Sequence, residues 1–252
     1  MKKLLALSFV LLSSLGFANP IDDSCSEKVI WGAPQIAKEG NNQYLCHLGY
    51  AVNYNYATKV AYFVVERIKA SDLVKSASRK DDFRMNPLVD DDKEATLQDY
   101  AGSGYDRGHI APAADFSHSA EEMSESFYLT NMMPQVPNNN RGIWKKTEGM
   151  ARDYAEKYGE VYVISGTIYE GEKVVMGNGV LVPSHLYKII IDPKNKRAMA
   201  FLFPNTKLKV RTLPDHVTTI AEIEKRAGVN ISPKLPDSLK GIETTKANLN
   251  EW

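Results

Sequence analysis

The chain lacks an excess of charge of either sign, since its 31 lysines and arginines balance its 31 aspartates and glutamates. Without Lys2 and Lys3, which belong to the leader described below, the remainder is slightly acidic. This balance argues against a protein that holds nucleic acid by bulk positive charge. It leaves room for a local basic groove, or for a bound cation that supplies positive charge of its own.

Long apolar runs are absent after the first residues of the chain, so no membrane-spanning segment is expected. At the start, two lysines precede an apolar run over residues 4–12, and small residues follow up to Ala18. This is the pattern of a secretory signal peptide cleaved after Ala18, and the run is well short of the ~20 residues that a bilayer core needs. We expect a signal peptide over residues 1–18, a domain over residues 19–252, no membrane anchor, and a periplasmic or secreted protein.

Cysteine is scarce, with Cys25 and Cys46 only. In an exported protein a disulfide is favoured over two free thiols or half a zinc site. A closed loop of about twenty residues stabilises a fold by roughly 3 kcal/mol in the chain-entropy model. We therefore predict a structural disulfide. Four histidines lack the spacing of a zinc site and are interpreted as structural or exposed: His47, His118, His185 and His216.

The patterns of apolar residues favour one mixed α+β domain without repeats or linkers. Aromatic and β-branched residues predict two or three antiparallel strands over 43–67, and further strands over 160–165, 173–182, 186–192 and 198–203. Helices are predicted over 119–127, from about 140 to 158, and over 217–227, the last two ended by Gly159 and Gly228. The expected architecture is an antiparallel β-sheet flanked by helices.

The segment Y-D-R-G-H-I-A-P, residues 105–112, contains a histidine between an arginine and apolar residues. With an ordinary pKa near ~6.5, His109 can act as a general base. Arg107 lies on the same face of a regular strand and can bind phosphate oxygens in pairs. The alternative is a salt bridge between Asp106 and Arg107 beside a packed histidine, which spacing alone favours.

A second segment, residues 130–148, concentrates oxygen ligands that suit a hard cation such as Mg²⁺. These side chains are Asn131, Gln135, Asn138, Asn139, Asn140 and Glu148. Glu148 follows Asn140 by a little over two helical turns and could approach the same side. The alternative is a turn in which an asparagine caps the next helix, and the two interpretations are compatible.

Together these segments resemble a known family. Y-D-R-G-H-I-A-P, then F-Y-L-T-N-M-M-P-Q and N-x-x-x-W-x-x-x-E, is similar to the DNA/RNA non-specific endonucleases with the DRGH signature, the group that includes endonuclease G. Residues 79–84 resemble the family's D-F-R block, and 45–50 its early strand. Residues 182–188 resemble its V-P-T-H-F-Y-K strand, with Ser184 in place of threonine, and 223–228 its late helix. The resemblance covers nearly the whole chain after the leader.

The resemblance implies a ββα-metal motif within the larger α+β domain and a role for each matching residue. It implies that His109 is the general base, that Asn140 is the single direct protein ligand of Mg²⁺, and that Glu148 orients metal-bound water. Asn131 would place the base and the phosphate, and Arg107 would contact phosphate or brace the site. Arg79 would stabilise the transition-state charge. Mn²⁺ is a possible substitute, and Asn139 keeps a smaller claim as the ligand.

The function implied is sequence-non-specific hydrolysis of DNA and RNA with 5′-phosphate products. DNA and RNA would be bound through their phosphate backbone, because phosphate contacts carry little sequence information. Two other classes stay open. One is a binding protein that keeps the fold without activity, and the other is a phosphodiesterase or phosphatase for small substrates. Trp144 is interpreted as a core anchor of its helix, and Asp90 to Asp92 as a solvated loop.

Overall fold

The computed structural model describes residues 25–37 and 40–252. The predicted signal peptide and its cleavage site lie outside the described residues. A seven-stranded sheet with antiparallel neighbours runs through the molecule in the order β12-β11-β10-β7-β4-β3-β2. Its strands are β2 (Asn42–Cys46), β3 (Tyr50–Asn55), β4 (Val60–Lys69), β7 (Glu160–Ile168), β10 (His185–Asp192), β11 (Arg197–Pro204) and β12 (Val217–Thr218).

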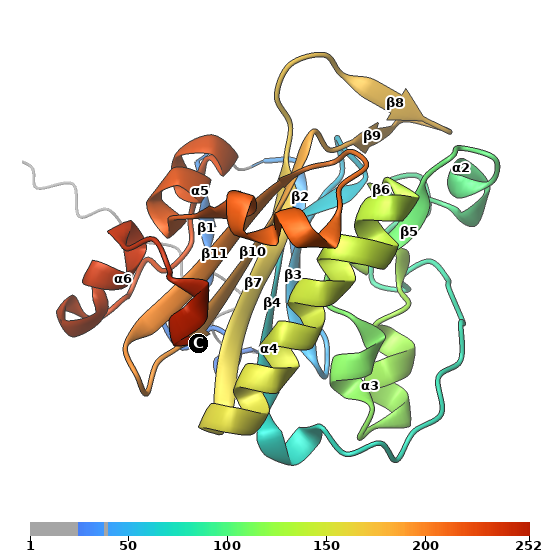
Figure 1. Ribbon diagram of the computed structural model, residues 1–252. Coiled ribbons are helices and arrows are strands. Elements are labelled where there is room, and N and C mark those ends of the chain that lie inside the picture. The colour runs from blue at the N-terminus through green and yellow to red at the C-terminus, as the bar shows by residue number, and fades with distance from the viewer. Residues whose placement is uncertain (1–24, 38–39) are drawn as a thin grey trace, which may run out of the picture.

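Helices cover both faces of this sheet (Figure 1). One face carries α4 (Lys145–Tyr158) and, beyond it, α3 (Ala120–Glu125) and the short α2 (Leu97–Tyr100). The other face carries α5 (Ile220–Ala227) and α6 (Gly241–Thr244). Three two-stranded pairs complete the strands: β1 (Gln35–Ile36) with β13 (Val229–Asn230), β5 (Asp106–His109) with β6 (Met132–Gln135), and β8 (Val174–Met176) with β9 (Val180–Val182). The predicted α+β architecture is confirmed.

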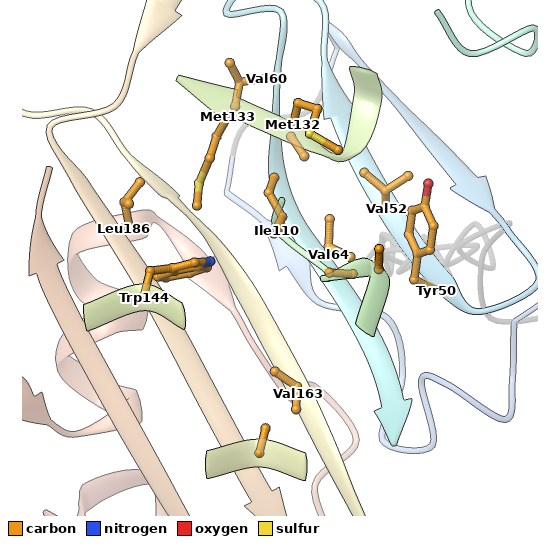
Figure 2. Packing of buried hydrophobic residues seen from close by; sticks show 14 of the residues in the cluster. Tyr50, Val52, Val60, Val64, Ile110, Met132, Met133, Trp144, Val163 and Leu186 are labelled. Atoms are coloured by element: carbon orange, nitrogen blue, oxygen red, sulfur yellow. The ribbon is translucent and has the colours of Figure 1, made fainter. Parts of the chain in front are cut away.

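Side chains alternate between the two faces of the strands and so divide the apolar core into two layers. The layer beneath α4 contains Val64, Val163 and Leu186, and Trp144 points onto it from the start of the helix (Figure 2). The layer beneath α5 contains their neighbours along the strands, such as Val65 and Ile164. Each face of the sheet thus has its own apolar layer, one beneath α4 and one beneath α5.

The β5–β6 hairpin and α4 form the expected ββα unit. The two strands pair antiparallel, with Asp106 opposite Gln135 and His109 opposite Met132. Gly108 is required here, because a Cβ atom at this position would lie 2.1 Å from Oε1 of Gln135. Ile110 and Met133 point from this unit into the core (Figure 2), which fixes the hairpin on the sheet.

The chain between β6 and α4 departs from a regular helix. Residues Asn139–Trp144 form a π-helix, η4, which runs directly into α4. Its preceding residue, Asn138, makes no side-chain cap hydrogen bond, so the interpretation of an asparagine N-cap is wrong. The predicted end of the helix is confirmed, because Gly159 follows α4 with a φ of 101°, which favours glycine.

Two further predictions can be compared with the structure. Cys25 and Cys46 form the predicted disulfide, with their Cα atoms 5.8 Å apart. The helix predicted over 217–227 is shorter, because Val217 and Thr218 pair with β11 as strand β12 and Thr219 caps α5. Within residues 25–37 and 40–252 no helix is long and apolar enough to cross a membrane.

Candidate active site

His109 ends strand β5 and is half-buried between two aromatic rings. Its imidazole lies 4.8 Å from the ring of Phe127, edge to face, and 5.6 Å from that of Phe83. Its carbonyl oxygen accepts a hydrogen bond from Nε1 of Trp144 over 3.1 Å. In the part of the chain that the structure describes, no group bonds to the buried Nε2 of the ring. The ring is therefore held by packing, and its buried Nε2 has no partner among the described residues.

Each of these two aromatic rings also contacts an arginine. The guanidinium of Arg107 is 4.4 Å from the centre of the Phe83 ring, and that of Arg79 is 5.0 Å from the centre of the Phe127 ring. Nε of Arg79 also donates to Asp81 over 2.8 Å. The same two rings that pack against His109 thus position two cations that can bind phosphate.

The structure decides against the alternative of an Asp106–Arg107 salt bridge. Both carboxylate oxygens of Asp106 pair with Arg141, at 2.6 and 2.8 Å, which leaves Arg107 on Phe83. The side chain of Arg107 is exposed and its charge can face a ligand. The DRGH segment consequently presents an exposed arginine that is not neutralised by its neighbour Asp106.

His109 is held in its neutral form. Burial lowers its pKa from 6.5 to about 3, and the positive charges of Arg79 and Arg107 act in the same direction, against a smaller opposing effect of Asp81. A neutral imidazole can accept a proton throughout the physiological pH range. A bound phosphate would offset the arginine charges and make the imidazole a stronger base at the time when it is needed.

The π-helix η4 separates the two candidate metal ligands. Asn139 is fully buried; its oxygen accepts from Gln135 over 3.1 Å and its nitrogen donates to the carbonyl of Pro204 over 3.0 Å. Asn140 is half-buried, and its nitrogen donates to Asp106 over 2.9 Å. Because Asp106 takes the amide nitrogen, the amide oxygen of Asn140 is the atom left for a cation. Asn139 serves the fold instead.

These residues fit a divalent cation bound by few protein ligands. Among the described residues, no group of three or more His, Cys, Asp or Glu side chains could hold a metal ion. A hard cation at Asn140 would thus keep most of its water ligands, as Mg²⁺ does. π-Helical turns within longer helices are frequent at functional sites, and η4 presents Asn140 at such a turn.

Glu148 lies on the first part of α4, near a set of interior charges. Burial raises the pKa of its carboxyl group to about 7, Lys188 lowers it, Asp115 raises it, and Arg152 lowers it. Near neutral pH this carboxylate can therefore gain or lose a proton with little change in conditions.

Asn131 is fully buried and acts on the chain beyond the histidine. Its side-chain oxygen accepts from the backbone NH of Ala111 over 3.0 Å, and its nitrogen donates to the carbonyls of Ala111 and Ser126, both over 2.8 Å. These three bonds use both ends of the amide. Asn131 thus braces the segment that follows His109, and each polar atom of its side chain is engaged in these bonds.

Several residues important to the site have no signal of their own in the sequence. Phe83 and Phe127 are separated by more than forty positions, and only folding places both rings on His109. Trp144 is fully buried, which confirms it as a core anchor, but its hydrogen bond to His109 was not predicted. The ion pair of Asp115 and Arg152 was not predicted either, because buried charges are rare and no sequence spacing indicates them.

Comparison with known proteins agrees with this geometry. A model of the DNA/RNA non-specific endonuclease family matches residues 32–238. The chain belongs to this family. Its members are nucleases that hydrolyse phosphodiester bonds and depend on a divalent metal ion. The resemblance inferred from the DRGH segment and the asparagine-rich segment is thereby confirmed.

Individual relatives match over most of the chain. Mitochondrial nuclease EXOG of Xenopus laevis is 34% identical over 231 residues, which cover 84% of this chain and 63% of that protein. Nuclease C1 of Cunninghamella echinulata var. echinulata is 34% identical, over 86% of this chain and 92% of its own length. A chain in a crystal structure of the EndoG/EndoGI complex superposes with a TM-score of 0.76 at 25% identity, covering 84% of this chain and 92% of that chain.

These relatives correct one expectation. EXOG from Xenopus laevis and Homo sapiens, and the related nucleases of Saccharomyces cerevisiae and Schizosaccharomyces pombe, are mitochondrial by name. The predicted periplasmic or secreted location is contradicted by them. That prediction depended on the charge and apolarity of residues 1–18, and such a pattern shows a targeting segment without specifying the compartment.

Proposed function

We propose that this chain is a magnesium-dependent, sequence-non-specific endonuclease that hydrolyses phosphodiester bonds of DNA and RNA. The observation that carries the proposal is the neutral His109, whose ring has an unpartnered nitrogen and packs between Phe83 and Phe127, the two rings that Arg107 and Arg79 contact. A hydrogen bond from Trp144 connects His109 to the turn that carries Asn140. A base, phosphate-binding cations and an oxygen ligand are the groups that phosphodiester hydrolysis needs.

In this mechanism His109 accepts the proton of a water molecule that attacks phosphorus in line with the leaving 3′ oxygen. Arg79 and Arg107 stabilise the additional negative charge of the phosphorane. A divalent cation held by the amide oxygen of Asn140 would, when bound, neutralise the phosphate and help the leaving oxygen depart. Glu148, once ionised, orients water at the site. The 5′-phosphate product follows from the resemblance to the family.

Both DNA and RNA fit the same mechanism. The base is a side chain of the protein, so cleavage does not require the 2′-hydroxyl group that distinguishes RNA. The charged groups brought together, Arg79 and Arg107, address phosphate and carry no base preference. We therefore expect cleavage of DNA and RNA without sequence preference.

The deciding experiment is divalent-dependent cleavage of supercoiled plasmid and of structured RNA by the purified protein. We expect nicking and then degradation in Mg²⁺, with Mn²⁺ as a substitute, and loss of activity with a chelator. His109→Ala should be inactive, while His118→Ala, a change of the half-buried histidine beside Glu122, should cut like the wild type.

Two outcomes would contradict the proposal. A wild-type protein that binds DNA but does not nick it in any divalent metal would be a binding protein on a nuclease fold. A protein that hydrolyses a small phosphodiester without competition by DNA would be an enzyme for small substrates. Plasmid cleavage by His109→Ala at the wild-type rate would leave the nuclease but remove the proposed base.

A further inference from the structure

A cavity of about 410 Å³ lies next to the candidate active site. Its walls come from four parts of the chain: the connection after η1 (Ala70–Asp72), η2 (Ala113–Phe116), α3 and α4. Figure 1 shows this connection running from the C-terminal end of α4 past α3. The volume lies in the usual range of small-molecule sites, and the proposed mechanism uses none of the lining side chains except Arg79.

The wall formed by the connection is held in place by hydrogen bonds. The backbone NH groups of Ser76 and Ala77 both donate to the carbonyl of Ser117, over 3.0 and 2.9 Å. Oγ of Ser76 donates to the carbonyl of His118 over 2.7 Å. These three bonds join the connection to the chain that leads into α3. The cavity is therefore a formed part of the fold.

Two features connect the cavity with the candidate active site. Arg79 lines the cavity, and its guanidinium lies 5.0 Å from the centre of the Phe127 ring, which packs against His109. Ala113 and Ala114 also line the cavity, and they directly follow the segment that carries His109. A phosphate bound by Arg79 would thus have the cavity beside it.

The interior of the cavity is mostly apolar. Leu73 and Ala77 pack against the core layer beneath α4, and Met123 belongs to that layer. Arg152 also lines the cavity, but its charge is compensated by an ion pair with Asp115 at 2.5 Å. Because an unpaired charge is costly to place among apolar groups, this interior disfavours phosphate and suits an uncharged nucleobase.

The exposed rim carries opposite charges on its two sides. Lys75 and Arg79 lie on the connection, and Asp153 and Glu156 lie on α4. Phosphate is attracted to the first side and repelled by the second. Carboxylates can accept hydrogen bonds from the amino groups of bases. The rim thus favours one direction of a bound nucleotide, with its phosphate at Arg79 and its base toward α4.

We propose that this cavity is a nucleoside site: it holds the base and sugar on the 3′ side of the cleaved bond, while Arg79 and Lys75 bind the phosphate of the same nucleotide. The inference rests on the proposed function, in which that phosphate stays on this nucleoside after cleavage. A base in the cavity has left the base stack, so the substrate is a nucleotide that is unpaired or can unpair.

The test compares two ligands by calorimetry in the presence of Mg²⁺. These are 2′-deoxycytidine 5′-monophosphate and 2-deoxyribose 5-phosphate, which lacks the base. Burial of the base should make the nucleotide bind about tenfold more tightly. Ala114→Leu, which narrows the cavity, should remove this preference. Ala247→Leu is the matched control, because Ala247 lines a separate cavity of about 530 Å³ near the C-terminus, and should retain it.

A second variant tests the orientation of the nucleotide. Lys75→Gln removes a charge on the phosphate side of the rim, so it should weaken both ligands by the same factor, about two- to fivefold for an exposed charge. A loss confined to the nucleotide would place the base at Lys75 and overturn the proposed orientation.

The nucleoside site and the nuclease activity can fail separately. Equal affinity of the wild type for the two ligands would refute the site, as would an undiminished preference in folded Ala114→Leu. If Ala114→Leu does not fold, the methyl resonance of Met123 decides in the wild type, identified by its loss in Met123→Leu. It must shift with the nucleotide and not with the sugar phosphate. A protein that shows the preference but never cuts plasmid would keep the site and lose the proposed function.

Discussion

Nε1 of Trp144 donates to the carbonyl oxygen of His109 over 3.1 Å, so this hydrogen bond connects the turn that carries Asn140 with the strand that carries His109, the proposed base. Trp144→Phe keeps the ring and removes this bond. Leaving the carbonyl unpaired should lower the free energy of unfolding by about 1–3 kcal/mol. Because His109, the proposed base, also loses this hydrogen bond, kcat should fall while KM changes little.

Urea unfolding and plasmid-cleavage kinetics measure the two effects of this change. Trp31→Phe is the matched control, since Trp31 packs on Tyr162 at the opposite face of the sheet. Activity should be unaffected there. Equal kcat in Trp144→Phe and the wild type would show that the hydrogen bond serves the fold alone.

Replacing the base tests the chemistry directly. His109→Ala should reduce kcat by roughly 10²- to 10⁴-fold, the usual contribution of a general base. Because the pKa of His109 is lowered to about 3, protonation of this ring should not produce an acid limb near pH 6.5 in kcat/KM. A limb near 6.5 that is present in the wild type and assigned to His109 by NMR titration would contradict the structure.

The contribution of His47 to stability should fall as the pH drops from 7 to 5. The buried His47 has a pKa lowered from 6.5 to about 4, chiefly by burial, so the unfolded chain binds a proton in this range and the folded chain does not. The contribution of His47 is complete above pH 6.5 and is lost as the pH falls below that value. It amounts to at most about 2 kcal/mol between pH 7 and 5.

Urea unfolding at several pH values can measure this loss. His47→Gln places a neutral amide beside Asn86, whose Nδ2 lies 3.0 Å from Nε2 of the ring, and should remove the part of the pH dependence that His47 contributes. His118→Gln, at a half-buried position, should not. An unchanged slope in His47→Gln would mean that other groups govern acid sensitivity.

The two neighbouring asparagines should respond differently to alanine. Asn140→Ala should raise the Mg²⁺ concentration needed for half-maximal rate, with little change in stability. Asn139→Ala removes three buried hydrogen bonds, one from Gln135 and two to backbone carbonyls, and should lower stability by about 1–3 kcal/mol. Magnesium titrations and thermal melts of both variants distinguish the roles; an unaltered titration for Asn140→Ala would exclude it as the ligand.

Removal of the disulfide should affect stability and spare the site. The variant with both Cys25→Ser and Cys46→Ser should lose roughly 3 kcal/mol of unfolding free energy, as expected for a loop of this length. Cys25 packs in the core layer beneath α5, away from α4. At 25 °C the rate of plasmid cleavage should stay at the wild-type level, and a lower rate in the folded variant would connect the bond to the site.

Much of the fold could be read from local patterns. Alternating apolar residues predicted the strands of the central sheet, and Gly159 and Gly228 predicted two helix ends. These features could be predicted because they depend on residues that are close together in the sequence. The π-helix at Asn139 could not be read, since a local sequence does not specify one additional residue per turn. The strand β12 was hidden for a similar reason: Val217 pairs with a partner far away in sequence.

The site was predictable to the extent that its residues lie in short motifs. His109, Asn140 and Glu148 could be named from spacing and resemblance, but their physical states could not. The low pKa of His109 arises from burial and from Arg79, thirty positions away. The raised pKa of Glu148 arises from burial, which the charge of Lys188, forty positions away, opposes. These pKa shifts depend on burial and on charges that only folding brings close, so short sequence motifs do not predict them.

The π-helix has a consequence for the length of this segment. Each residue of an α-helix advances the chain by 1.5 Å and about 100°. Deleting one residue from Asn139–Trp144 could restore a regular helix, and would turn every side chain before the deletion by that angle relative to α4. The direction of Asn140 relative to Glu148 would then change by that angle. The number of residues in this turn therefore determines the direction in which Asn140, the proposed metal ligand, points relative to α4.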